Sequence, residues 1–200
     1  MNSKKTILSS LITLLFVSLI GFGFIITKDN IPKGWFKAGS SPNSYEIGTE
    51  QNAGQKGENI VYIKSIEKDI KGFGTLMQSF SADKYLNKRV RFSGYIKSNN
   101  VTGSAALWMR IDGKGSPVKT LEFDNMGNHP IKGTTDWKKY SIVLDVPGPS
   151  NMINFGILLA GTGEVLVDNL KFEEVNKNVP TTDMMSKEQR QEEPVNLNFK

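Results

Sequence analysis

The 200-residue chain contains no cysteine and only one histidine. The absence of cysteine excludes disulfides, thiolate catalysis, zinc ribbons and attachment of a lipid to an N-terminal cysteine. The single histidine, His129, precedes a proline and has no catalytic partner in the sequence pattern, so we expect a solvated loop residue. The chain also lacks a block of one charge sign, although its formal net charge is +5. Interspersed charges are typical of a solvated surface and argue against a nucleic-acid partner.

The longest uncharged run lies near the N-terminus, from Ile7 to Thr27, directly after a lysine pair. A helix of this length spans about 30 Å, the thickness of the hydrocarbon core of a membrane. We therefore predict that residues 1–28 form a signal-anchor, with a transmembrane helix at 7–27 that tethers a single-pass protein to the cell membrane with its domain extracytoplasmic. A buried core helix is the less favoured alternative. Cleavage and secretion is another, disfavoured because the run is long for a signal peptide and lacks an A-x-A-like end.

After a linker at 29–43, short apolar alternations bounded by turn residues predict a β-sandwich domain at 44–175. The candidate strands are 44–50, 59–66, 73–80, 88–97, 104–112, 119–124, 137–145, 153–159 and 163–173. Half-buried strands without crossover helices are typical of antiparallel sheets packed face to face, so the predicted fold class is all-β, an antiparallel sandwich of the jelly-roll kind. The polar segment at 176–200 is predicted to be a disordered tail.

Three segments carry a family resemblance: the Gly-Thr-Thr-Asp-Trp run at 133–137, the strand that follows it, and the last strand with its Asp168-Asn169-Leu170 end. Their order resembles the second half of carbohydrate-binding jelly rolls of the galactose-binding-like superfamily. Most of residues 32–175 also resemble an uncharacterised bacterial domain that is found fused to transcriptional regulators. That resemblance rests on Gly34-Trp35, Gly39-Ser40, Tyr45, Gln78, Tyr85, Lys88 to Ser93, Leu107 to Arg110 and Phe123 to Met126. It implies a galactose-binding-like fold and a sensory or ligand-binding module, and it names no ligand.

The strand at 105–112 is the predicted binding site. Its aliphatic residues alternate with Trp108, Arg110 and Asp112, which therefore share the outward face of a sheet. An aromatic ring beside a guanidinium and a carboxylate suits a sugar, whose C–H face stacks on the ring while its hydroxyls bind the polar pair. The alternative is structural, with Trp108 in the core and Arg110 paired with Asp112.

Two further segments contain residues that are candidates for contacting a ligand or a metal ion. Asp124 and Asn125, in the loop after the strand at 119–124, are predicted to contact the ligand; Asx-turns within the loop explain the same residues. This loop departs from a calcium loop because Thr135 stands where a bidentate glutamate belongs. At Asp168, the resemblance to sugar-binding jelly rolls implies a structural calcium, against the alternative of a hydrogen bond to backbone. No other cofactor is predicted.

These features predict a non-enzymatic, membrane-tethered binding module for carbohydrate or another component of the cell envelope. The alternative is a protein-interaction or sensory scaffold domain without a small-molecule ligand. Hydrolysis is the least favoured function. Glu122 and Asp124 share a strand face, but so does any pair of residues two positions apart in a strand. A glycosidase requires a defined distance between its two carboxyl groups, which a sequence does not show.

Overall fold

Alternating side chains and turn residues produce nine β-strands in residues 29–185, the part of the chain that the computed structural model describes. In chain order these are β1 (Phe36–Gly39), β2 (Tyr45–Glu50), β3 (Ile60–Ser65), β4 (Phe73–Ser81), β5 (Arg89–Gly113), β6 (Thr120–Asp124), β7 (Ile131–Asp145), β8 (Ser150–Ala160) and β9 (Glu164–Val175). Two short 3₁₀ turns accompany them, η1 (Pro42–Ser44) and η2 (Asp83–Tyr85). The predicted membrane helix at 7–27 lies outside the described residues, and within 29–185 no helix is long and apolar enough to cross a membrane.

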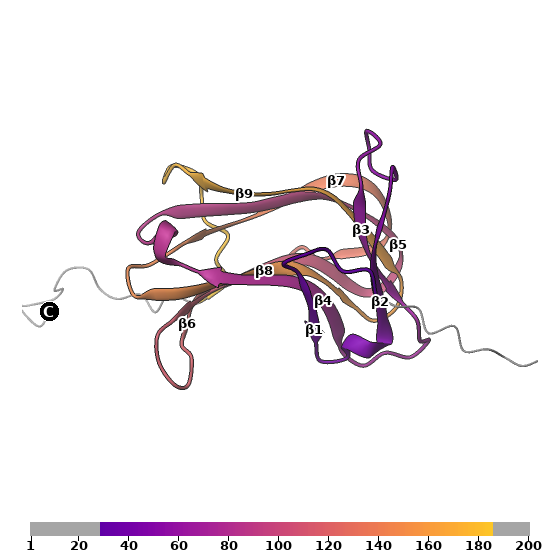
Figure 1. Cartoon of the computed structure of the whole chain (residues 1–200), viewed down its shortest axis with the longest axis horizontal. Coiled ribbons are helices and arrows are strands. Elements are labelled where there is room, and N and C mark those ends of the chain that lie inside the picture. Colours follow the sequence, from indigo (N-terminus) through magenta and orange to yellow (C-terminus); the bar gives the residue numbers. More distant parts are fainter. Residues whose placement is uncertain (1–28, 186–200) are drawn as a thin grey trace, which may run out of the picture.

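The strands form two layers joined by β5 (Figure 1). In the first layer, residues 89–99 of β5 pair with β7 on one side and with β9 on the other, and β3 and β2 follow β9. In the second layer, residues 104–113 of β5 pair with β6 and with β8, and β4 and β1 follow β8. All pairings are antiparallel. The prediction of an all-β antiparallel sandwich is confirmed.

The change of layer takes place at residues 100–103 of β5. Asn100 has a φ of 50°, in the left-handed region, and the register with β7 shifts on both sides of it. At Gly103 the backbone of β8 comes so close that an added Cβ would lie 2.4 Å from the carbonyl oxygen of Ala160, so only glycine fits. The sequence prediction of two strands, 88–97 and 104–112, with a turn between them is therefore wrong in one respect: the chain bends but stays paired.

The inner faces of both layers follow the predicted period of two. In β5, Leu107, Met109 and Ile111 are completely buried, and Val90 and Phe92 are buried against them from the first layer. The buried positions are even-numbered before the bend, as at Val90 and Ile96, and odd-numbered after it, as at Leu107. The alternation therefore shifts by one residue at the bend, and each half of the strand supplies side chains to the core from its own layer.

Residues after β9 close one side of the sandwich. The amide of Thr182 donates to the carbonyl of Val143 on β7 at 2.8 Å, and the amide of Met184 donates to the carbonyl of Phe123 on β6 at 2.8 Å. The carboxylate of Asp183 accepts the Phe123 amide at 3.0 Å. The segment thus crosses from the edge of one layer to the edge of the other. The predicted disorder of 176–200 is wrong as far as Met184, and residues 186–200 lie outside the described residues.

Arg89 fixes the start of this segment. Its guanidinium donates to both carboxylate oxygens of Asp145, at 2.8 and 2.9 Å, and its remaining nitrogen donates to the carbonyls of Lys177 at 2.7 Å and Val179 at 2.5 Å. The hydrogen bonds to Asp145 raise the pKa of the Arg89 guanidinium. One side chain therefore holds a strand of the first layer and the closing segment together.

The N-terminal boundary also differs from the prediction. The expected linker at 29–43 contains β1, which pairs with β4, and Trp35, which packs against the core at Phe155. Lys37 forms a 2.9 Å ion pair with Asp29, whose other oxygen accepts the Ile47 amide. The sandwich therefore begins at the start of the described residues.

We expect Arg89→Ala to lower the free energy of unfolding by about 2 kcal/mol, because it removes a bidentate ion pair and two carbonyl contacts that are mostly shielded from water. In a domain of this size the melting temperature should fall by roughly 4–8 °C. Arg91→Ala is the matched control, because Arg91 on the same strand bonds only to the Glu173 carboxylate. Equal melting temperatures for the two variants, measured by circular dichroism, would contradict a fastening role for Arg89.

Candidate functional site

Trp108 lies on the outer face of the second layer but does not offer an open ring. In register it stands opposite Gly156 of β8, and its indole nitrogen donates at 2.8 Å to the hydroxyl of Thr75 on β4, beyond β8. Only 8% of Trp108 and 2% of Thr75 is exposed, and the Thr75 hydroxyl donates onward to the Ile157 carbonyl at 2.6 Å. The indole therefore ties β5 to β4 across β8. The prediction of a stacking platform is wrong, because the ring is covered and its polar edge is satisfied within the protein.

Arg110 and Asp112 form a structural pair beside Trp108. Two guanidinium nitrogens donate to one oxygen of Asp112, at 3.1 and 2.8 Å, and the amide of Asn154 donates to the same oxygen at 2.8 Å. Ser79 in turn donates to the Asn154 carbonyl at 2.5 Å. Asp112 is 4% exposed and its charge is met by these donors, whereas the Arg110 side chain remains 44% exposed. Of the predicted trio, only Arg110 faces solvent.

Asp124 and Asn125 serve the loop that follows β6. An oxygen of Asp124 accepts the Met126 amide at 2.7 Å, and an oxygen of Asn125 accepts the Gly127 amide at 3.1 Å, which are Asx-turns. Asp124 is 1% exposed. Because Arg110 pairs with Phe123 in register, the next residue, Asp124, points to the opposite face of the layer. The structure therefore does not bring Asp124 together with Arg110, and the prediction that both contact one ligand is wrong.

Asp168 is buried in β9, with 2% of its surface exposed. One carboxylate oxygen accepts the amide of Gln55 at 3.0 Å, from the loop between β2 and β3, as the backbone alternative predicted. Within residues 29–185 no three histidine, cysteine, aspartate or glutamate side chains are grouped so as to hold a metal ion. Calcium at Asp168 stays a prediction.

The side of the sandwich opposite the closing segment is open. β1 pairs with β4 only as far as Met77, and β3 pairs with β9 only as far as Val167, so the remainder of β4 and of β9 are free strand edges. Between these edges lies a cleft of about 510 Å³, which we call the edge cleft. It is lined by Gln78, Phe80, Ser81, Asp83, Lys84, Tyr85, Phe155 and Phe172.

Three half-buried aromatic rings form the wall of the edge cleft. Phe80 of β4 and Phe172 of β9 meet edge to face, with centroids 5.4 Å apart, and Tyr85 of η2 lies 5.3 Å from Phe172 and 5.7 Å from Phe80. Behind them, Phe155 packs against Phe80 and Phe172 and is 6% exposed. Edge-to-face packing fixes the orientation of each ring. The cleft is therefore bounded by rigid aromatic surface supplied by both layers.

Two polar side chains of the edge cleft are free to bind a ligand. Gln78 occupies an inward position of β4 between Leu76 and Phe80, and its side chain has no hydrogen-bond partner among residues 29–185. Lys84 of η2 has no acidic partner in the same part of the chain. A carboxamide supplies two donors and an acceptor, the pattern that matches adjacent hydroxyl groups. The sequence carries a signal for this site, because a polar residue at an inward position of a strand is an exception to the core pattern.

No protein-family model matches the chain. A curated relative, the uncharacterized HTH-type transcriptional regulator YbfP of Bacillus subtilis (strain 168), is 46% identical over 168 residues, which cover 84% of this chain and 56% of that protein. The chain therefore spans little more than half the length of this relative. Its name agrees with the predicted resemblance to regulators, but it does not show that the shared domain is fused to a DNA-binding segment.

Two solved structures are similar to the sandwich. Family 16 carbohydrate-binding module-2 has a TM-score of 0.51 and 13% identity, over 65% of this chain and 86% of that one. The sandwich therefore resembles a carbohydrate-binding module in fold. The enzymatically active domain of tailspike protein 4 from bacteriophage CBA120 also has a TM-score of 0.51, with 9% identity over 72% of this chain and 20% of that one. At these identities the likeness establishes the carbohydrate-binding-module fold alone.

Trp108→Ala should destabilise the protein by about 3 kcal/mol, because it empties buried volume and leaves the Thr75 hydroxyl without its donor. Thermal unfolding followed by circular dichroism measures the effect. Phe36→Ala is the control, because Phe36 lies on the same outer face with 44% of its surface exposed, and its loss should change stability by about 0.5 kcal/mol or less. A Trp108→Ala variant as stable as the control would show that the indole is surface rather than core.

Proposed function

We propose that residues 29–185 are a carbohydrate-binding module that holds part of a glycan chain in the edge cleft. The observation that carries this proposal is the combination of fixed, half-exposed aromatic rings with the free amide of Gln78. Sugars present apolar C–H faces that pack on aromatic rings, and hydroxyls that bind planar amides. The carbohydrate-binding-module fold supports the same function.

The dimensions of the edge cleft suit this function. Its volume of about 510 Å³ lies within the roughly 300–1,000 Å³ of small-molecule sites. Because it runs along free edges of β4 and β9, a longer chain is able to continue past the site on either side. Binding to an internal stretch of polymer is therefore compatible with the cleft.

Binding without hydrolysis is the proposed activity. Glycoside hydrolysis uses a pair of carboxyl groups on either side of the scissile bond. Among the described residues that line the edge cleft, Asp83 is the single carboxylate. The buried carboxylates Asp112, Glu122, Asp124 and Asp168 lie in other parts of the sandwich, and the three aspartates accept hydrogen bonds that maintain the fold.

The uncharged run at 7–27 supports a membrane tether, and we propose that it anchors the module with the edge cleft exposed to the cell envelope. A glycan of the envelope is then the natural ligand class. The name of the Bacillus subtilis relative favours a second candidate, a sensory module in which occupancy of the same cleft is reported to another segment or protein.

We expect Gln78→Ala and Tyr85→Ala to weaken glycan binding roughly tenfold each, because each removes a contact worth about 1–1.5 kcal/mol. A glycan array identifies a bound oligosaccharide, and isothermal titration calorimetry then gives its dissociation constant for each variant. Melting temperatures distinguish lost contacts from lost folding, and Gln78 is the cleaner position because its side chain has no partner in the described protein.

Arg110→Ala is the matched control, because Arg110 is the exposed member of the outer-face pair and lies away from the edge cleft. Its affinity should stay within about twofold of the wild type. If Arg110→Ala alone lost affinity for the glycan, the binding site would have to lie on the outer face of the second layer. Failure of the wild type to bind any glycan would contradict the proposal and favour the scaffold alternative.

A further inference from the structure

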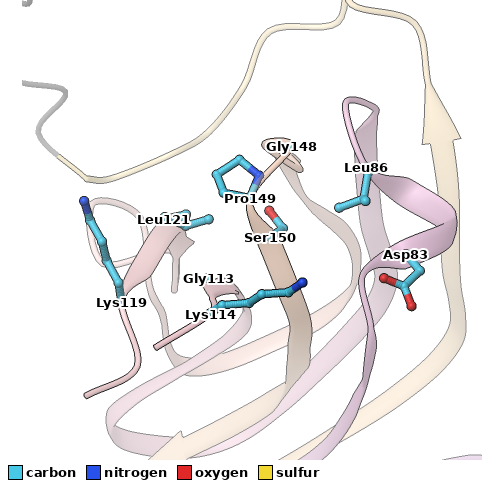
Figure 2. Close-up of a pocket in the computed structure, with 9 residues that line it drawn as sticks. All are labelled: Asp83, Leu86, Gly113, Lys114, Lys119, Leu121, Gly148, Pro149 and Ser150. Carbon is cyan, nitrogen blue, oxygen red and sulfur yellow. The ribbon is translucent and has the colours of Figure 1, made fainter. Parts of the chain in front are cut away.

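A second cavity, of about 330 Å³, lies beside the edge cleft at one end of the sandwich (Figure 2). We call it the end pocket. Its walls are the β5–β6 hairpin, the turn that leads into β8, and η2 with the residue after it. Asp83 lines both cavities, so η2 forms the wall between them.

The end pocket carries an excess of positive charge. Lys114 and Lys119 project from the hairpin, and neither has an acidic partner among residues 29–185. Figure 2 shows Lys114 extending toward the wall that carries Asp83, which is the single carboxylate of the lining. Lys84, on the far side of η2, adds a further unpaired cation. Lys114 and Lys119 are both exposed, so their excess over one carboxylate attracts an anionic group with a strength that depends on salt.

A buried hydroxyl supplies the second, independent observation. Ser150 is 3% exposed and lines the end pocket, and its hydroxyl has no hydrogen-bond partner among residues 29–185. A buried unsatisfied hydroxyl is destabilising, and an alanine would occupy the same place without that cost. A ligand oxygen that reaches this hydroxyl would satisfy it by accepting its proton, and the hydrogen bond is stronger where that oxygen is anionic.

The remaining lining indicates that the anionic group is attached to a carbon skeleton. Leu86, Leu121 and Pro149 add apolar surface to the lining, interspersed with the charged side chains (Figure 2). A free inorganic ion gains nothing from such a surface, whereas a substituted sugar or polyol packs its C–H groups against it. The pocket therefore fits an anionic group together with part of the molecule that bears it.

We propose that the end pocket binds the phosphodiester or carboxylate of an acidic glycan whose adjoining sugar occupies the edge cleft. Lys114 and Lys119 neutralise the anion, Ser150 donates a hydrogen bond to it, and the shared wall at Asp83 sets the spacing between charge and sugar. The link between the two cavities rests on the proposed function, whereas the anion site itself stands on the end pocket alone.

Three polymers test the proposal by isothermal titration calorimetry at low and at physiological salt: poly(glycerol phosphate), polygalacturonate and a neutral glycan. We expect one of the two acidic polymers to bind most tightly, which identifies the anionic group, and its affinity to fall with salt. Lys114→Gln and Lys119→Gln should each weaken acidic-polymer binding roughly three- to fivefold and leave neutral-glycan binding unchanged. Lys132→Gln, an exposed lysine on β7 without an acidic partner in the described residues, is the control.

Ser150→Ala tests the contribution of the hydroxyl to binding separately from that of the lysine charges. We expect this variant to lose affinity for the acidic polymer while its melting temperature stays equal to or rises above that of the wild type, because the unsatisfied group is gone. Lysine variants that behave like Lys132→Gln toward both acidic polymers would overturn the proposal, whatever the neutral glycan does.

A further measurement distinguishes failure of the proposed glycan binding from failure of the anion site. If the wild type binds no polymer, glycerol phosphate is the probe: a rise in melting temperature that Lys114→Gln reduces and Lys132→Gln does not supports the anion site, and the absence of any rise overturns it. A different result would overturn the end pocket alone. In that case Tyr85→Ala weakens the binding of neutral glycan, whereas Lys114→Gln and Lys119→Gln leave the binding of acidic polymer unchanged. The edge cleft would then remain the glycan site.

Discussion

The bend in β5 is the constraint on which the rest of the sandwich depends. One strand takes part in both layers, and each half of it is hydrogen-bonded on both sides. Because β6 and β7 pair with the two halves and are joined to each other by the closing segment, they mark the same side of the molecule. β8 and β9 pair with the opposite sides of those halves, which places β4 and the end of β9 along the other side.

The strand edges on the two sides of the sandwich are therefore covered in different ways. On the β6–β7 side, residues 182–184 form hydrogen bonds with the edge groups of Val143 and Phe123. The Arg89 side chain holds the same closing segment through the carbonyls of Lys177 and Val179. On the β4–β9 side no strand or segment among residues 29–185 pairs with the last residues of either edge, and aromatic side chains fill the gap between the layers instead. Free edges invite unwanted pairing, and native proteins cover them unless they serve a purpose. The open side is where aromatic surface and unpaired polar groups coincide, which is why we place binding there.

The sequence predicted much of the fold because a period of two is a local property. Strand positions, the core residues of β5 and the face on which Trp108 lies all follow from it. The residues on adjacent strands that contact a given side chain cannot be predicted from this periodicity. The hydroxyl of Thr75 that covers the edge of the indole lies two strands away in the sheet, and its approach depends on Gly156 between them, so an outward position was mistaken for an exposed one. The turn signal at Asn99-Asn100 was real, since Asn100 is left-handed, but it produces a bend because both flanking segments keep their partners. Gln78 shows the reverse case: a polar residue at an inward strand position is visible in the sequence, yet it was not predicted as a site residue, and it lines the edge cleft.

In the proposed binding mode, ligand enters between the free edges of β4 and β9. Amide chemical-shift mapping of the isotopically labelled protein, titrated with the oligosaccharide selected on a glycan array, tests this claim residue by residue. We expect the largest shift changes on residues 78–85 and on Phe172. Changes concentrated on residues 106–112, with the amides of 78–85 unmoved, would contradict it.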